Sequence, residues 1–337
     1  MISGHFWKRI RSIFGARRPL LILPYRSFAN RDRIFLKGRV LQDRLINQQL
    51  SNSKWRSLMN SIKRFRSREI PHQPVRMVIE NQQFTATTTN EGYFIIDQPW
   101  KIPNLTKQQH WLPAHLFIET PAEDAAPVTA QAEVLLPCIN AAYGVISDID
   151  DTILQTHVNS ILRLKLLYAT FFKNAHQRLP VEGVVKLFQQ LAQGKSGQDN
   201  NPFFYVSNSP WNLYDLLERF LDFQQLPKGP ILLRDYGYKP DGPFKAHKLI
   251  TLTRIFEMYP HLAFVLFGDT ASEDADHYLA LADRFPQQVK AVYIRLTQNT
   301  RNARRVLALI QNRQKENIRI VRSSAEMKAH AQRLGLI

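Results

Sequence analysis

Three apolar runs in the second half of the sequence each end in small polar or acidic residues, and they constrain the fold more than any other feature. They are residues 143–151 (YGVISDIDD), 202–210 (PFFYVSNSP) and 263–270 (AFVLFGDT). Helical patterns lie between and after them, at 181–193, 211–223, 245–259 and 273–284, and a fourth run follows at 291–297. Buried strands that alternate with helices predict a parallel α/β sheet.

Polar side chains at the ends of these runs are predicted to form one site, because the carboxyl ends of parallel strands meet at one edge of a sheet. The candidates are Asp148, Asp150, Asp151, Ser207, Lys248, Asp269 and Asp274. Three carboxylates within four residues repel one another, and a divalent cation such as magnesium relieves that repulsion. Taken singly, each residue is typical of a surface loop, a helix cap or a solvated helix face. Their order after successive strands favours a shared site.

The net charge of +17 is distributed very unevenly. Residues 1–76 hold 18 Lys and Arg but only 3 Asp and Glu, whereas residues 77–337 carry a balance of only +2. Such a field attracts nucleic acid or an anionic membrane surface. The 337 residues leave room for about two domains. The single cysteine, Cys138, excludes an intrachain disulfide and favours a cytoplasmic location, and no apolar run reaches the ~18 residues of a membrane-spanning helix.

Residues 1–20 are predicted to be a basic amphipathic arm. Drawn as a helix, the arm places aromatic and apolar side chains beside Lys and Arg, as in helices that lie in a membrane interface. A terminus that only packs on its own domain is the alternative. Residues 21–139 are predicted to be a β-rich domain, with a basic helical insertion at 52–68 that packs on the core or adds a second membrane-surface element. The expected strands lie at 34–42, 75–98 and 131–137.

The ordered motifs resemble those of the haloacid-dehalogenase superfamily of phosphotransferases: DIDDT at 148–152, then Ser207, Lys248 and GDTASED at 268–274. Longer segments, among them GVISDIDDTILQT and FFYVSNSPWNLYDLL, are similar to the catalytic domain of the actin-patch-associated phosphatidate phosphatases and their bacterial relatives. The resemblance covers residues 140–337 and extends weakly upstream. It implies a Rossmannoid parallel sheet with a small cap, preceded by a β-rich, sandwich-like domain.

The resemblance also implies a role for each matched position. Asp148 would be the nucleophile that forms an aspartyl-phosphate, and Asp150 would be the general acid and then the base. Ser207 and Lys248 would hold the phosphoryl oxygens, and Thr152 completes the catalytic set. The expected magnesium ligands are Asp148, Asp150, Asp269 and Asp274.

Three further positions are expected to bind substrate: Asn208, Lys245 and Arg234. Lys245 also competes with Lys248 as the active-site lysine, and Lys248 is preferred because the family lysine directly follows a histidine, here His247. The family motif Gly-Asp-Ser-Gly reads Gly-Asp-Thr-Ala here, and Ala271 has less backbone freedom than glycine. Residues 159–179 are interpreted as a helix that packs on the core, or as a small cap beside the site.

Together these features predict an Mg²⁺-dependent phosphatidate phosphatase, a phosphoric monoester hydrolase that produces diacylglycerol and phosphate. The basic N-terminal quarter would hold a cytoplasmic enzyme peripherally on an anionic phospholipid surface, with no nucleic-acid partner and no integral membrane segment. Two alternatives stay open. One is a phosphatase for a soluble phosphoester or a nucleic-acid end, and the other is a non-catalytic module that binds lipid or protein.

Overall fold

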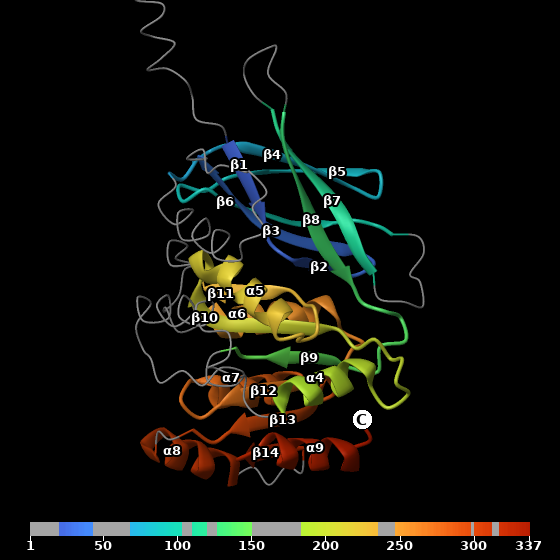
Figure 1. Ribbon diagram of the computed structural model, residues 1–337, viewed down its shortest axis with the longest axis vertical. Helices are drawn as coiled ribbons and strands as arrows, with labels where there is room; N and C mark the ends of the chain where they lie inside the picture. The colour runs from blue at the N-terminus through green and yellow to red at the C-terminus, as the bar shows by residue number, and fades with distance from the viewer. Residues whose placement is uncertain are drawn as a thin grey trace, which may run out of the picture.

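The protein consists of two packed sheets, which follow one another along the chain. The computed structural model describes residues 20–42, 68–102, 110–119, 127–149, 183–234, 247–297, 300–311 and 317–337. Figure 1 shows a mainly antiparallel sheet at one end of the long axis and a parallel sheet with its helices at the other. The prediction of a mixed α/β chain with a β-rich first part is therefore confirmed.

Several predicted segments lie outside the described residues. They are the arm at 1–20 apart from Leu20, the insertion at 52–68 apart from Arg68, and the helix or cap at 159–179.

Eight strands form the N-terminal sheet. They are β1 (Leu20–Pro24), β2 (Ser27–Ala29), β3 (Arg33–Gln42), β4 (Pro74–Ile79), β5 (Gln82–Thr87), β6 (Tyr93–Pro99), β7 (His110–Ile118) and β8 (Val128–Leu136). The strands pair in the order β1-β3-β2-β8-β7-β4-β5, and β6 also pairs with β3. All pairs are antiparallel except β2 with β8. The predicted strands at 34–42, 75–98 and 131–137 are confirmed as β3, β4 to β6, and β8.

Alternating burial explains why these segments form strands around a core of their own. In β4, Val75, Met77 and Ile79 are buried while the residues between them are partly exposed, which is the period of two expected for a sheet with one covered face. The side-chain amide of Gln98 in β6 donates to the carbonyl of Thr85 in β5 (3.4 Å). The sheet thus curls until β5 and β6 meet around a common apolar core.

Six strands form the second sheet, and all of its pairs are parallel. They are β9 (Gly144–Ser147), β10 (Phe203–Pro210), β11 (Ile231–Arg234), β12 (Phe264–Asp269), β13 (Val289–Arg295) and β14 (Ile318–Val321), in the order β11-β10-β9-β12-β13-β14. Every residue of β9 and β12 is buried, as is typical of central strands in a parallel sheet covered on both faces. The apolar runs identified in the sequence are thus confirmed as its central strands.

Helices connect these strands. They are α4 (Val184–Gln193), the short 3₁₀ helix η1 (Trp211–Leu213), α5 (Tyr214–Phe223), α6 (His247–Met258), α7 (Asp274–Arg284), α8 (Thr300–Gln311) and α9 (Ser324–Arg333). After β9, the chain forms β10 and β11 on one side of it, and then β12, β13 and β14 on the other side. Since crossovers between parallel strands are right-handed as a rule, this order places helices on both faces of the sheet, and the switch point lies between β9 and β12.

Aromatic side chains join the two sheets. Phe28 of β2 meets the ring of Phe204 in β10 edge-on, with centroids 5.6 Å apart. Tyr25, between β1 and β2, stacks on Trp211 at 4.5 Å. Both N-terminal residues belong to the same apolar cluster as the parallel sheet, so the two parts share a continuous core.

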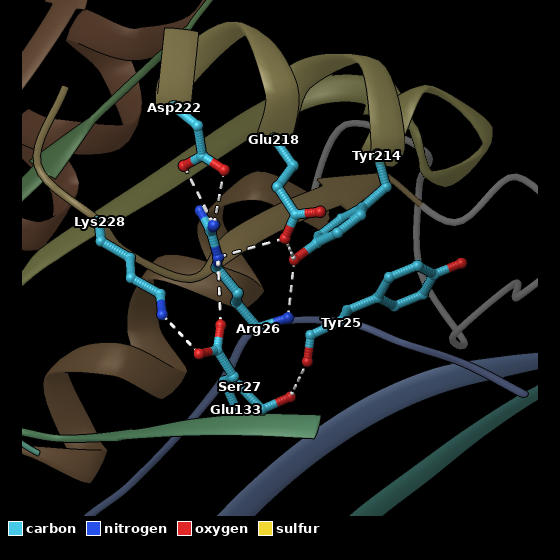
Figure 2. A network of polar contacts seen from close by, with 8 residues as sticks. All are labelled: Tyr25, Arg26, Ser27, Glu133, Tyr214, Glu218, Asp222 and Lys228. Carbon is cyan, nitrogen blue, oxygen red and sulfur yellow. Dashed lines mark hydrogen bonds and ion pairs between the residues drawn. The ribbon is translucent and has the colours of Figure 1, made fainter. Parts of the chain in front are cut away.

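A polar network borders this shared core, and Figure 2 shows it from close by. The guanidinium of Arg26 donates to both carboxylate oxygens of Asp222 on α5 (3.0 and 2.9 Å) and lies 3.2 Å from Glu218 on the same helix. Its backbone N–H donates to the hydroxyl of Tyr214 (2.7 Å). Glu133 of β8 extends the network by accepting from Lys228 (2.6 Å). Arg26, in the connection between β1 and β2, thus binds helix α5 beside the parallel sheet.

Candidate active site

Four charged side chains meet at the carboxyl edge of the parallel sheet. Asp148 directly follows β9, and its backbone N–H donates to the carbonyl of Phe267 in the adjacent β12 (2.8 Å). Asp269 is the last residue of β12. Asp274 begins α7, and Lys248 is the second residue of α6. The switch point of the sheet therefore gathers these residues from four separate segments.

The cluster is compact and almost completely buried. Carboxylate oxygens of Asp148, Asp269 and Asp274 all lie within 4.8 Å of one another. The Lys248 ammonium lies 2.6 Å from Asp148 and also forms an ion pair with Asp274. The four side chains belong to residues that are 0–3% exposed. Among the described residues, three carboxylates thus share one lysine away from water, an arrangement that costs stability unless another cation completes it.

The pKa values show how the charges of the cluster act on one another. Burial alone would lower the pKa of Lys248, but Asp148 and Asp274 outweigh burial and hold this pKa well above its usual range. Lys248 is therefore a permanent cation. Burial and the nearby Asp274 carboxylate raise the pKa of Asp269 to about 7. The metal-free cluster therefore resists full ionisation, as expected for carboxylates that lack enough positive charge.

The loop after β12 fixes the orientation of Asp269. One of its carboxylate oxygens accepts the backbone N–H groups of Ala271 (2.5 Å) and Ser272 (2.9 Å). The hydroxyl of Thr270 bonds to that of Thr297 (3.0 Å). Ala271 is not among the residues with positive φ, so this turn does not require glycine at that position.

Gly268 allows the close approach of β12 and α7. A Cβ atom at this position would lie only 2.6 Å from the Cβ of Asp274 and 2.8 Å from the ring of Tyr278. Any larger residue would therefore push Asp274 away from Lys248. Gly268 therefore contributes to the site by leaving room for the side chains of Asp274 and Tyr278.

Two residues of α7 belong to the surroundings of the cluster and were missed in the sequence. Tyr278 is fully buried, and its hydroxyl donates to the carbonyl of Phe267 (2.9 Å). His277 is buried, and burial together with the Lys248 charge lowers its pKa. Their spacing of three and four residues after Asp274 places them on the same helix face, a signal that the sequence does contain.

The structure places the other expected residues as follows. Ser207 is buried in β10, and its hydroxyl accepts the backbone N–H of Ser209 (2.9 Å). Tyr205 pairs with Ser147 of β9. Ser207, two residues farther along β10, therefore lies level with Ile149, the residue that follows Asp148. Asn208 is exposed on β10, and Arg234 is half-buried at the end of β11. The other expected site residues, namely Asp150, Asp151, Thr152 and Lys245, lie outside the described residues.

The cluster fits a magnesium ion by its donor chemistry. Three carboxylates offer hard oxygen ligands within reach of one centre, and their negative charge exceeds the single charge of Lys248. The raised pKa of Asp269 indicates that the cluster lacks positive charge without such an ion. Asp148, Asp269 and Asp274 are the described residues that would hold the ion.

Fold and site together define an α/β protein with a buried carboxylate and lysine cluster at the switch point of a parallel sheet. Residues 143–296 match the family model described as "Phosphatidate phosphatase APP1, catalytic domain". This segment contains all four members of the cluster. The match supports a relationship to the APP1 phosphatidate phosphatase family.

Comparison with curated proteins agrees with the family match. Phosphatidate phosphatase APP1 of Saccharomyces cerevisiae is 28% identical over 264 residues, which cover 72% of this chain and 41% of the yeast protein. An uncharacterized protein of Schizosaccharomyces pombe is 29% identical over 218 residues, which cover 63% of this chain and 34% of that protein. The chain thus spans less than half the length of these relatives.

Solved structures give only distant likenesses. A β-glucuronidase of Bifidobacterium dentium has a TM-score of 0.22 at 10% identity and covers 90% of this chain and 60% of its own. A carbohydrate acetylesterase of Xanthomonas citri has a TM-score of 0.23 at 10% identity and covers 83% and 52%. Scores this low carry no conclusion about fold or activity.

Among the helices that the structure describes, none is both long enough and apolar enough to cross a membrane.

Proposed function

We propose that this chain is a magnesium-dependent phosphatidate phosphatase with a haloacid-dehalogenase-type catalytic fold. The observation that carries the proposal is the position of Lys248, which forms ion pairs with two of three clustered and buried carboxylates. This cluster lies inside the segment that matches the catalytic domain of the APP1 phosphatidate phosphatases. Similarity and geometry therefore point to the same residues.

Asp148 is the proposed nucleophile. Its carboxylate lies 2.6 Å from the Lys248 ammonium, which favours the ionised form that a nucleophile needs. One Asp148 oxygen attacks the phosphorus of phosphatidate, and the bond between phosphorus and the glycerol oxygen breaks. The products of this step are an aspartyl-phosphate and diacylglycerol, whose oxygen takes a proton from Asp150.

Water completes the proposed cycle. Asp150 removes a proton from the water molecule, whose oxygen attacks the phosphorus and releases phosphate from Asp148. Ser207 and Lys248 hold phosphoryl oxygens during both steps, where the charge shifts most. Asp269 and Asp274 complete the ligand set for magnesium. When bound, that ion neutralises charge on the phosphoryl group.

The basic N-terminal quarter supplies the proposed membrane association. Residues 1–76 carry most of the excess positive charge, and each Lys or Arg near an anionic leaflet contributes about 1 kcal/mol to binding. The proposed substrate lies in the same leaflet. Attraction to the surface would therefore also bring the catalytic cluster close to its substrate.

The deciding experiment measures phosphate release from phosphatidate vesicles by the full chain, with Mg²⁺ or with a chelator. Release only with Mg²⁺, and its loss in Asp148→Asn, is the expected result. A soluble phosphoester tested in parallel separates the substrate classes. Turnover of the soluble compound with none of phosphatidate would reject the lipid substrate and leave the phosphatase chemistry intact. Equal activities of wild type and Asp148→Asn would reject the catalytic role of the cluster.

A further inference from the structure

A second polar site lies farther along the same edge of the parallel sheet. It is a cavity of about 530 Å³ between α4, α9 and the ends of β13 and β14. Four of the residues that line it carry a positive charge: Lys186, Arg295, Arg322 and Lys328. Three of these four come from separate elements, and Arg322 comes from the turn between β14 and α9. The fold therefore brings Lys186 and Arg295, which are distant in the sequence, together with Arg322 and Lys328.

Among the described residues, no carboxylate neutralises three of these four cations. Lys186, Arg322 and Lys328 form no ion pair with any residue that the structure describes. The acidic residue of the adjacent helix turn, Glu326, instead accepts the backbone N–H of Arg322 (2.9 Å). Like charges held around one cavity repel one another, so an anionic ligand would stabilise the arrangement.

The start of α9 adds neutral donors to the same cavity. Ser323 caps the helix by accepting the N–H of Glu326, which leaves the first-turn amides of Ser324 and Ala325 without a carbonyl acceptor inside the helix. Both residues line the cavity. Helix N-termini favour anions because their N–H groups and the helix dipole point toward them.

Ser324 provides an independent sign of a ligand. The residue is only 6% exposed, and its hydroxyl has no hydrogen-bond partner among the described residues. A buried hydroxyl without a partner is unfavourable, and it is one of the groups that line the cavity. Bound oxygen atoms would satisfy it.

We propose that this cavity binds a phosphate group. A tetrahedral phosphate offers enough oxygens to accept from the guanidinium, ammonium, hydroxyl and amide donors at once, whereas a carboxylate offers only two. Strand register places the site beside the catalytic cluster, because Asp269 pairs with Arg295 and Arg295 pairs with Val321. At about 4.8 Å per strand, the backbone of Arg295 lies roughly 5 Å from that of Asp269, and the backbone of Val321 lies roughly 10 Å from it. Arg322, Ser324 and Lys328 lie beyond the segment 143–296 that matches the family model.

The phosphate group has two sources with the same chemistry. It belongs either to an anionic lipid headgroup or to a free, soluble phosphate. Binding is therefore measured with two probes: inorganic phosphate, by calorimetry, and vesicles with or without phosphatidate, by co-sedimentation. A chelator is present throughout, since the catalytic carboxylates then repel phosphate and contribute little to the signal.

The test variant is Arg322→Gln/Lys328→Gln, and Arg304→Gln/Lys195→Gln is its control. The control removes the same charge from two exposed residues that do not line the cavity. We expect the test variant to bind inorganic phosphate at least about tenfold more weakly, with the control unchanged. Ser324→Ala, which keeps the Ser323 cap, should weaken binding about two- to tenfold.

The vesicle probe identifies the source of the phosphate. Selective loss of binding to phosphatidate vesicles in the test variant assigns the cavity to a lipid headgroup, and retained binding assigns it to soluble phosphate. Equal losses of phosphate affinity in the test and control variants would overturn the proposal, because net charge alone would then explain them. Failure of the wild type to bind phosphate would overturn it as well. Circular dichroism and thermal melting verify that each variant is folded.

Discussion

The catalytic cluster and the Arg26 network both combine carboxylates with basic side chains, but the two sets of carboxylates differ in their exposure to water. Both contain three carboxylates, but those of the network keep contact with water: the side chains of Glu133, Glu218 and Asp222 are 44%, 31% and 51% exposed. The carboxylates of the cluster are buried. Water screens the first set and leaves the second to repel itself. The network therefore connects two sheets with charges that stay hydrated, whereas the cluster concentrates unfavourable charge that the proposed magnesium ion would neutralise.

The largest expected effect comes from removing the single cation of the cluster. Lys248→Met keeps the length and much of the volume of the side chain but removes the one cation that the described residues place among the three buried carboxylates. We expect the free energy of unfolding to fall by about 3–5 kcal/mol, as measured by denaturant titration. Lys290→Met, at an exposed position, serves as the control and should change stability little. A loss below about 1 kcal/mol in Lys248→Met would show that the cluster is not electrostatically strained.

The second expected effect is a pH dependence that involves Asp269. Its pKa in the folded protein is raised from 3.8 to about 7, so the folded state holds a proton that the unfolded state releases over this range. In a chelator, the contribution of Asp269 to stability is therefore most favourable below about pH 4 and is lost as the pH rises through about 7.

Melting temperatures of wild type and Asp269→Asn across this pH range isolate that contribution, because the other carboxylates are common to both proteins. We expect the variant to gain stability relative to wild type as the pH rises. Mg²⁺ added above pH 7 should stabilise the wild type more than the variant. A constant difference between the two proteins from pH 4 to pH 8 would contradict the raised pKa.

The third expected effect concerns the network between the sheets. Arg26→Met removes the guanidinium but keeps the backbone N–H that donates to Tyr214. Because the partner carboxylates remain partly hydrated, we expect a loss of about 1–2 kcal/mol in unfolding free energy and unchanged phosphate release from phosphatidate vesicles. Arg284→Met is the matched control, since its ion pair with Glu257 is exposed on both sides. If Arg26→Met and Arg284→Met lose similar unfolding free energies, the ion pairs of Arg26 between the two sheets are no stronger than an ordinary surface ion pair.

The sequence predicted the parallel sheet well because its strands are continuous apolar runs that end in polar residues. Asp148, Asp269 and Asp274 follow directly from those run ends, and the structure brings them together. His277 and Tyr278 could be predicted to share a helix face with Asp274 only once the helix is known to begin at Asp274, and the sequence does not fix that start.

Neither the Arg26 network nor the cavity proposed to bind phosphate could be predicted from the sequence. Arg26 lies 196 residues from Asp222 along the chain, and nothing in either segment indicates the other. The cations of the cavity likewise come from α4, β13, α9 and the turn before α9, and in the sequence each is an ordinary lysine or arginine. Such sites depend on tertiary packing alone. The excess positive charge of residues 1–76 is visible in the sequence, whereas the cationic cavity, formed by residues of the nearly neutral remainder, is not.

The smallest expected effect on stability is that of Asp148→Asn, and it distinguishes the catalytic cluster from the Arg26 network most clearly. Asp148→Asn removes one of three repelling charges, keeps the size of the side chain, and leaves an amide oxygen to accept from Lys248. Lys248 also retains its ion pair with Asp274. We therefore expect the unfolding free energy to stay within about 1 kcal/mol of the wild type or to rise, although phosphate release is lost. Arg26→Met should show the reverse, with lower stability and intact turnover. If Asp148→Asn instead loses as much stability as Lys248→Met, the Asp148 carboxylate is needed to hold the fold. Its absence would then explain the lost turnover without a role in chemistry.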